Sequence, residues 1–277
     1  MDSSTMTAWV IAPVALPTFC ITGMCIVYAM ALSNGHVCPV SNWVYNRSCE
    51  KEIPKQSAPI ACCTLDHIPL VSKCGTVPPE SCLFGLICTL GSFMVILVGL
   101  LRYAQVMETY LQSVLNTAGL FSGWICAIGL IIIGNFQVDE VKILHYIGAG
   151  MAFPTSMLFV VLQLALTYRM AQKKHEYWIG HIRFFITILA FITLVFSGVL
   201  FIQESFELQH AAAICEWAFI ITILLFYGTF AFDFGTISTD TFLLMLKTNQ
   251  VCKSFRSESS MVSSRHVNSN SENIAMI

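Results

Sequence analysis

Six cysteines in one short segment are the densest group of reactive side chains in this chain. They are Cys38, Cys49, Cys62, Cys63, Cys74 and Cys82. An even number of cysteines at this density is typical of a disulfide-bonded segment in an oxidising compartment. Adjacent Cys62 and Cys63 do not easily join each other, and the other pairings stay open. The alternative is a zinc site with His36 and His67. Because the segment lacks a Cys-x-x-Cys pair, we favour disulfides.

The same segment carries a glycosylation sequence, Asn46-Arg47-Ser48. This pattern is modified on asparagine when it lies in a loop on the secretory or cell-surface side of a membrane. We therefore predict that Asn46 bears a glycan and that the cysteine-rich segment faces the outside of the cell.

A second set of chemically interesting residues is polar and lies in or beside apolar stretches. It comprises Asn135, Gln137, His145, Gln203, His210 and Glu216, which we expect to face one polar cluster in the outer leaflet. Intramembrane acids such as Glu216 are costly and are candidates for an ion, proton or lipid-headgroup site. The alternative is hydrogen bonding between helices that fixes their register. We favour this alternative, because one acid and a few amides make no continuous polar pathway.

Charged residues at the opposite ends of the apolar stretches form a third set, Arg102, Arg169, Arg183 and Asp233. We expect Asp233 to pair with one of the arginines. The arginines otherwise suit anchoring at the lipid headgroups, or contact with anionic lipids. Cys252 lies beside Lys253 and Arg256, where S-acylation and a free cytosolic thiol are both open.

The chain carries none of the motifs that would indicate an enzyme. It has no nucleophile elbow, phosphate-binding glycine loop, paired metal motif or carboxylate dyad. We therefore predict a non-enzymatic protein without a cofactor. The formal net charge of −2 gives no reason to expect nucleic-acid binding.

The elements that position these residues are six apolar runs. They span about 8–32, 81–101, 114–136, 147–168, 184–203 and 211–232. About 20 helical residues cross a bilayer core, and in lipid the backbone must satisfy its own hydrogen bonds. The chain is 11% charged, against about 25% in soluble domains. The sequence therefore predicts an all-α integral membrane protein, a six-transmembrane-helix bundle with a disulfide-rich first extracellular loop at 33–80. This membrane domain covers 1–241, followed by a cytoplasmic, disordered tail at 242–277.

Two further features set the ends and the orientation. The first run is followed by Ala29-Met30-Ala31, which resembles a signal-peptidase site, but its length favours retention as a helix. Lysine and arginine are concentrated in the second and fourth loops and in the tail. By the positive-inside rule, both termini are predicted to be cytoplasmic.

With six spans and a cysteine-rich first loop in place, the chain resembles the transmembrane protein 150 branch of the DRAM family, the damage-regulated autophagy modulators. The stretches that carry the resemblance are Thr7-Ala8-Trp9, Val27-Tyr28-Ala29-Met30-Ala31, His36-Val37-Cys38-Pro39-Val40, Cys62-Cys63-Thr64-Leu65-Asp66, Pro78-Pro79-Glu80-Ser81-Cys82-Leu83-Phe84, Gly134-Asn135-Phe136-Gln137-Val138-Asp139, Leu144-His145-Tyr146, Cys215-Glu216-Trp217, Tyr227-Gly228-Thr229-Phe230 and Ile274-Ala275-Met276-Ile277.

The resemblance implies a plasma-membrane adaptor that helps to recruit a peripheral phosphatidylinositol 4-kinase complex and so maintains phosphoinositides. Its partners would be that complex, bound at the cytoplasmic face, and membrane lipids, including anionic phosphoinositides. Relatives imply two alternatives, a mechanosensitive-type channel or channel modulator and an autophagy modulator of endosomal or lysosomal membranes.

Overall fold

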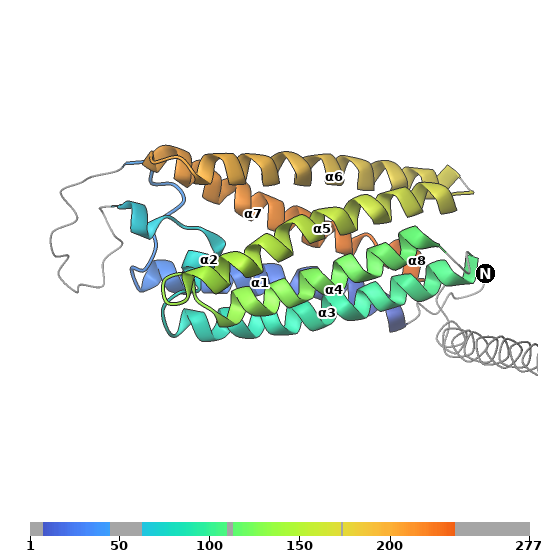
Figure 1. Cartoon of the computed structure of the whole chain (residues 1–277), viewed down its shortest axis with the longest axis horizontal. Helices are drawn as coiled ribbons and strands as arrows, with labels where there is room; N and C mark the ends of the chain where they lie inside the picture. The colour runs from blue at the N-terminus through green and yellow to red at the C-terminus, as the bar shows by residue number, and fades with distance from the viewer. Residues whose placement is uncertain (1–7, 45–62, 110–112, 173, 236–277) are drawn as a thin grey trace, which may run out of the picture.

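The structure is a computed structural model of the whole chain that describes residues 8–44, 63–109, 113–172 and 174–235 (Figure 1). Six of its helices are long and apolar enough to cross a membrane. They are α1 (Ile11–Ser33), α3 (Glu80–Thr109), α4 (Val114–Asn135), α5 (Lys142–Met170), α6 (Lys174–Phe201) and α7 (Phe206–Gly228). The predicted all-α six-helix membrane fold is therefore confirmed.

Four short helical elements complete the described part of the chain. They are η1 (Ala8–Val10), η3 (Leu65–His67), α2 (Val71–Cys74) and α8 (Ala231–Phe234). Several long helices extend past the apolar runs into polar residues, because a helix continues to satisfy its own backbone where it enters the headgroup region. Thus α3 begins at Glu80 and α5 at Lys142.

Local sequence signals explain where these helices begin and end. The helix α1 stops at Asn34, and the next residue, Gly35, has a φ of 77°, which only glycine adopts without strain. The helix α4 is preceded by Ser113, whose side chain accepts a hydrogen bond from the backbone N–H of Asn116. This N-cap satisfies one of the donors that a helix start leaves unpaired.

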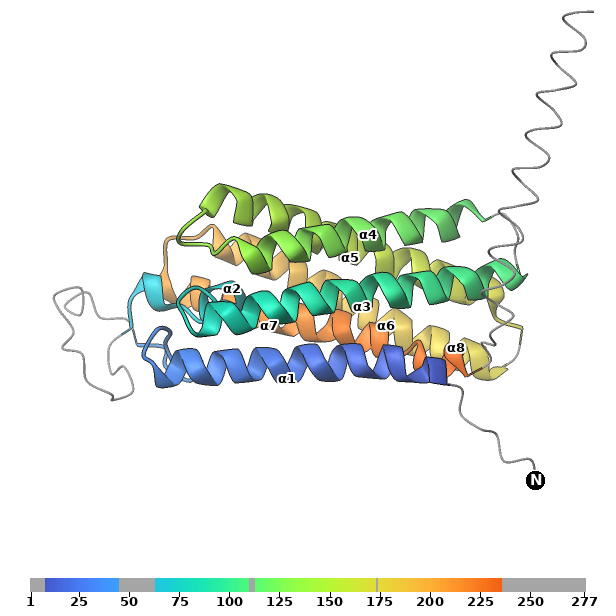
Figure 2. The ribbon, with the colours of Figure 1, turned by 90° about the horizontal axis from the view of Figure 1, so that it is seen from below.

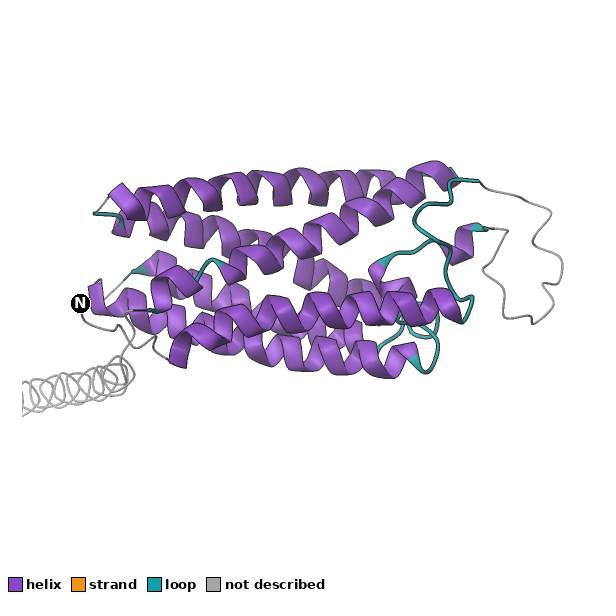
Figure 3. Ribbon diagram, turned by 180° about the vertical axis from the view of Figure 1, so that it is seen from behind, coloured by secondary structure: helices purple, strands orange, loops and turns teal. Residues whose placement is uncertain are grey.

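The six long helices form a closed ring of neighbours. Each of α3 to α6 packs against the helix that follows it, and α1 packs against both α7 and α3. Short connections make consecutive helices antiparallel. Figure 2 shows the start of α1 and the short helix α8 at one end, here called the tail end, and α2 at the other, here called the loop end. Figure 3 shows the same arrangement from behind, with the irregular segments of the first loop gathered at the loop end.

Glycines allow the closest approaches within the ring. A Cβ added to Gly129 of α4 would lie 2.7 Å from the backbone oxygen of Gly148 in α5. A Cβ added to Gly134 would lie 2.4 Å from the Cβ of Cys88 in α3. Small residues at helix contacts let membrane helices approach closely, so α3, α4 and α5 form a tightly packed layer.

Aromatic side chains fill the middle of the ring toward the tail end. Phe159 of α5 stacks on Tyr227 of α7 with ring centroids 5.0 Å apart, and Phe230 packs against both. All three side chains are buried. In contrast, α6 is the least covered of the six spans and turns side chains such as Phe185 and Phe191 outward, as expected of a lipid-facing helix.

Candidate functional site

The most heavily charged buried site is an arginine cluster at the tail end. Its members come from α3, α5, α6, α8 and the turn before α8; they are Arg102, Gln105, Gln163, Thr167, Arg183, Thr229 and Asp233. The two arginines are 1% and 0% exposed. Buried charges are tolerated only when they are paired and hydrogen-bonded, so the partners of each arginine decide what the cluster does.

Arg183 of α6 uses its whole guanidinium to join three elements. Its Nε donates to the Thr229 hydroxyl at 2.8 Å, and one Nη donates to the Thr167 hydroxyl at 2.7 Å. The other Nη donates to the Thr229 carbonyl oxygen at 3.2 Å and pairs with the carboxylate of Asp233. Arg183 therefore ties α6 to α5 and to the segment that leads into α8.

Arg102 makes the corresponding connections from α3. Its Nε donates to Gln163 at 3.2 Å, and an Nη donates to Gln105 at 2.8 Å. The same Nη lies 3.5 Å from the second carboxylate oxygen of Asp233. Gln105 in turn donates to the Asp233 carbonyl oxygen at 2.6 Å. Asp233 is thus held by both arginines and by a glutamine.

The ring of Phe230 is the second contact that the arginines share. The guanidinium carbons of Arg102 and Arg183 lie 5.4 and 4.8 Å from its centroid, within range of a cation–π interaction. One carboxylate and one ring face therefore serve two guanidinium groups.

The prediction that the arginines anchor the chain at the lipid headgroups does not fit Arg102 and Arg183, whereas Arg169 is exposed. Arg102 and Arg183 are buried among helices and are used up by protein acceptors, because both point into the ring rather than out of it. The predicted pairing of Asp233 with one arginine understates the arrangement, since it contacts two. Arg169 lies in the last turn of α5.

At the loop end, α7 holds the first loop through side chains that the sequence placed inside the membrane. Glu216 is 7% exposed, and its carboxylate accepts a hydrogen bond from the backbone N–H of Val71 at 3.1 Å, at the start of α2. The indole N–H of neighbouring Trp217 donates to the Pro69 carbonyl oxygen at 2.9 Å. Glu216 therefore joins α7 to the first residue of the short loop helix α2, and its described hydrogen bonds reach none of the other long helices.

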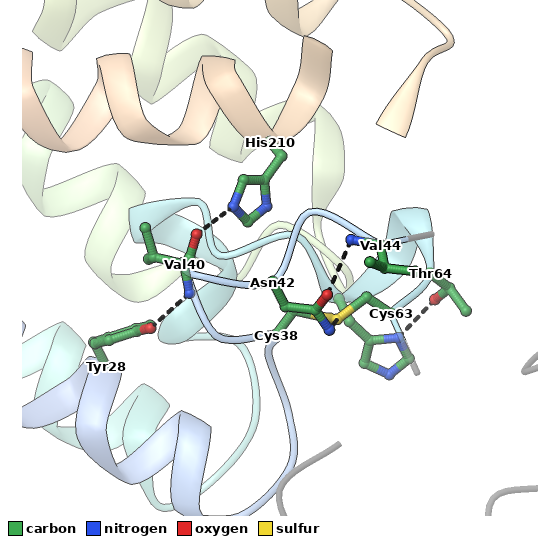
Figure 4. The surroundings of a disulfide bond; sticks show 9 residues. Tyr28, Cys38, Val40, Asn42, Val44, Cys63, Thr64 and His210 are labelled. Carbon is green, nitrogen blue, oxygen red and sulfur yellow. Dashed lines mark hydrogen bonds between the residues drawn. A yellow bond between two sulfur atoms is a disulfide. The ribbon is translucent and has the colours of Figure 1, made fainter. Parts of the chain in front are cut away.

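His210, in the first turns of α7, contacts the part of the loop that follows α1. Its Nε2 lies 2.8 Å from the Val40 carbonyl oxygen, and the Val40 N–H donates to the Tyr28 hydroxyl of α1 at 3.0 Å (Figure 4). The disulfide Cys38–Cys63 lies beside these contacts and joins the two described parts of the loop. The loop is thus fixed on the ends of α1 and α7.

Glu80 is a site residue that the sequence analysis missed. It is completely buried at the start of α3, where its Oε1 accepts from the Asn34 amide at 2.6 Å and lies 3.2 Å from Nδ1 of His36. Lys73 of α2 pairs with Asp139 before α5 at 2.5 Å. The sequence feature that could have identified Glu80 is its position directly after Pro78-Pro79, at the predicted start of a helix.

The six polar residues predicted to form one cluster are separated into several places. Asn135 donates to Thr89 of α3 and to the Ile131 carbonyl oxygen, and Gln137 lies beside it. His145 bonds the Phe136 carbonyl oxygen, and Gln203 is exposed at the end of α6. These residues therefore do not share one hydrogen-bonded cluster among the described residues, because they lie on different helices around the ring and their hydrogen bonds go to separate partners.

The cysteines also depart from the prediction. Cys74 and Cys82, expected to form disulfides, are free thiols in the structure. Cys74 is buried beneath the loop, whereas Cys82 is exposed on α3, so the two side chains lie in different environments. Burial raises the pKa of the Cys74 thiol above its ordinary value, with further contributions from Glu216 and Glu80, and keeps it protonated. Cys49 and Cys62 lie outside the described residues.

His36 and His67, considered for zinc, have other partners. His36 faces Glu80, and His67 lies 2.6 Å from the Thr64 hydroxyl. Burial lowers the pKa of His67, which favours its neutral form. Within the described residues no three histidine, cysteine or acidic side chains gather to hold a metal ion. Asn46, Cys252 and the tail 242–277 lie outside the described residues.

These features define the class of the protein. It is a multi-pass helical membrane protein with a loop docked at one end and a buried arginine cluster at the other. The family model described as Frag1/DRAM/Sfk1/Cwh43P N-terminal domain matches residues 8–237. The chain belongs to this family. No solved structure matches the chain.

Similar proteins narrow the branch. The chain is 53% identical to Transmembrane protein 150A of Xenopus laevis over 98% of this chain and 100% of the relative. It is 51% identical to Transmembrane protein 150A of Homo sapiens with the same coverage. It is 34% identical to the protein named Modulator of macroautophagy TMEM150B-B of Xenopus laevis, over 83% of this chain and 87% of the relative. None of these names describes an enzyme.

Proposed function

We propose that this chain is a non-enzymatic plasma-membrane adaptor that promotes recruitment of a phosphatidylinositol 4-kinase complex through its tail end. In this proposal both termini are cytoplasmic and the first loop is extracellular. The distribution of lysine and arginine among the loops supports the orientation. The recruitment itself rests on the resemblance to the transmembrane protein 150 branch.

The arginine cluster is the observation that supports an adaptor most directly. It connects α3, α5, α6 and α8 through side chains with almost no exposure. Asp233 lies two residues before the end of the described chain, and the segment 236–277 follows. The cluster therefore fixes the position from which the tail begins, which is what a recruiting surface on a membrane protein requires.

The buried arginines also change which residues are available for anionic lipids. Arg102 and Arg183 are committed to protein partners, so phosphoinositide contact at the tail end would fall to exposed cations such as Lys174. Lysines near an anionic leaflet each contribute about 1 kcal/mol of attraction.

The packing of the ring argues against the alternative of an ion channel. The buried carboxylates Glu80 and Glu216 lie at the loop end and the arginine cluster at the tail end, while Phe159, Tyr227 and Phe230 fill the ring toward the tail end. A conduction path would need polar groups or water through that aromatic layer.

An autophagy role is the second candidate, because relatives that share at least 30% of their residues with this chain are named modulators of macroautophagy. It differs from the first in location, since it places the protein in endosomal or lysosomal membranes. Imaging of the full chain with plasma-membrane and lysosomal markers separates the two.

The test of the adaptor removes residues 247–277 and compares the truncated protein with a version in which a glycine–serine sequence of equal length replaces them. Both should reach the plasma membrane, because the six apolar runs of the sequence end at about residue 232, before the segment that is removed. We expect both to lose kinase recruitment and to restore plasma-membrane phosphoinositide more slowly after depletion than the full chain. If the truncated protein restores it as fast as the full chain, the tail is not the recruiting segment.

A further inference from the structure

A shallow, open groove lies between α3 and α4 at the loop end. It has a volume of about 420 Å³ and is lined by Ser81, Cys82, Gly85, Leu86, Thr89, Gly134, Asn135 and Gln137. Ser81 and Thr89 are eight residues apart on one helix, so the groove extends about 12 Å along α3 from its first turn. It therefore begins at the end of the bundle and continues along the lipid-facing side.

The close approach of the two helices makes the floor of this groove. A Cβ on Gly85 would lie 2.9 Å from the Gly134 carbonyl oxygen, and one on Gly134 would clash with Cys88. Because neither glycine carries a side chain, the backbones meet at the bottom and leave the space above them open. The groove is thus a consequence of helix packing and has a fixed floor.

The walls carry hydrogen-bonding groups that the described part of the chain does not use. Ser81 is 7% exposed, so it is more than nine-tenths buried, and its hydroxyl has no partner among the described residues. Thr89 accepts from Asn135 at 3.4 Å but donates to no described acceptor, and the amide of Gln137 has no described partner. Polar side chains on a lipid-facing helix surface are costly and are candidates for function.

The chemistry of the lining selects the ligand. None of the lining side chains is ionised, and the nearby ion pair, Lys73 with Asp139, is closed at 2.5 Å. A charged headgroup would gain no countercharge from the lining. Hydroxyl and amide side chains both donate and accept, which matches sugar hydroxyls. Leu86 is 53% exposed and offers an apolar surface beside them.

From this combination we propose that the groove binds the sugar of an uncharged glycolipid in the outer leaflet. The polar wall holds the sugar at headgroup level, and the hydrocarbon chains continue down the lipid-facing side of α3 past Leu86. The proposal uses the orientation given above, with the loop end outside. It is independent of kinase recruitment, since the groove lies at the end of the bundle opposite the arginine cluster.

Cys82 provides a native probe, because its exposed thiol lines the groove. The full chain carrying Asn46→Gln, which removes the predicted glycan as a second source of sugar, is placed in phosphatidylcholine nanodiscs. The measurement is the rate at which a sulfonated maleimide modifies Cys82, followed by peptide mass spectrometry. We expect glucosylceramide in the disc to slow this reaction several-fold, and neither cholesterol nor soluble glucose to do so.

The variant Thr89→Val/Gln137→Ala removes two of the polar groups from positions that are not buried. At about 1 kcal/mol for each of two lost hydrogen bonds, it should require about thirtyfold more glucosylceramide for the same protection. The matched control, Gln203→Ala, removes an exposed amide just after α6, also at the loop end but outside the groove, and should behave like the parent. An unchanged rate in pure phosphatidylcholine shows that the variant groove is intact.

Three results would overturn the proposal. The first is equal Cys82 reactivity with and without glucosylceramide. The second is equal protection by cholesterol, which carries one hydroxyl and no sugar. The third is full protection of the double variant at the parent concentration of glucosylceramide.

Discussion

At the scale of single residues, the unusual feature is where the charges are buried. Glu80 and Glu216 are enclosed at the loop end, and Arg102 and Arg183 at the tail end. Each carboxylate accepts from the first loop or its junction with α1, while each arginine donates to neighbouring helices. Removing one partner of a buried charge pair leaves the other charge uncompensated, so these residues should be sensitive to substitution.

Asp233 is the first residue to test, because two buried arginines depend on it. Replacing it by asparagine keeps the shape but removes the negative charge, at a cost of about 3–5 kcal/mol. We expect Asp233→Asn to lower the thermal midpoint of the purified protein by about 10 °C. The control Glu108→Gln changes an exposed acid at the same end of α3 and should leave the midpoint unchanged. Equal midpoints for both variants would contradict a stabilising role for the cluster.

Glu216 separates hydrogen bonding from charge. In Glu216→Gln the amide oxygen still accepts from the Val71 N–H, so stability should stay near that of the parent. In Glu216→Leu that N–H loses its partner, which costs about 1–3 kcal/mol. Hydrogen–deuterium exchange of residues 63–74 should therefore rise in the leucine variant alone. An equal rise in both variants would show that the charge itself matters, and no rise in either would show that the hydrogen bond does not hold the loop.

At the scale of elements, the first loop is an integral part of the bundle. Its described segments are fixed by α1, α3 and α7 and are joined by Cys38–Cys63. A disulfide across this separation contributes about 3 kcal/mol in the chain-entropy account. The remaining described cysteines of this region differ in access, with Cys74 covered and Cys82 open.

Alkylation without reductant tests this element. We expect a cross-linked peptide containing Cys38 and Cys63, rapid alkylation of Cys82 in the native protein, and alkylation of Cys74 only after denaturation. Peptide mass spectrometry reads all three in one sample. A cross-link between Cys74 and Cys82, as the sequence pattern allowed, would show that the native loop is arranged differently.

At the scale of the whole molecule, the ring has two unlike ends. The loop end is covered by a docked, disulfide-bonded segment, and the tail end is closed by the arginine cluster. An even number of spans places both termini on the same side of a membrane. The orientation therefore decides which of these two ends faces the cytoplasm and which faces the outside.

Glycosylation of Asn46 is the direct test of that orientation. Glycosidase treatment should increase gel mobility, and Asn46→Gln should abolish the shift, because N-glycans are added only on the lumenal side of the secretory pathway, which becomes the outer side of the plasma membrane. An epitope on the tail should be detected in permeabilised cells alone. If a tag in the first loop is detected only after permeabilisation, the predicted orientation is reversed. The adaptor proposal then loses its basis, because the tail end would face the outside.

The sequence by itself determined that the chain is embedded in a membrane and that it forms six long helices. Six apolar runs without enough charge for a soluble surface leave helices as the way to satisfy the backbone in lipid, so the six-helix fold followed from composition and length. The sequence predicted the disulfide chemistry of the first loop only in part. The cysteine pattern indicated disulfides but did not identify the pair Cys38–Cys63.

Only the tertiary structure decided which polar residues meet. Arg102, Arg183 and Asp233 are far apart in sequence, and each lies at the end of an apolar run, where headgroup anchoring was equally reasonable. Glu216 and Val71 are separated by 145 positions. The order of helices around the ring and their rotation are set by the fit of side chains between neighbours. Because lipid solvates any apolar face equally well, hydropathy alone carries no information about that fit.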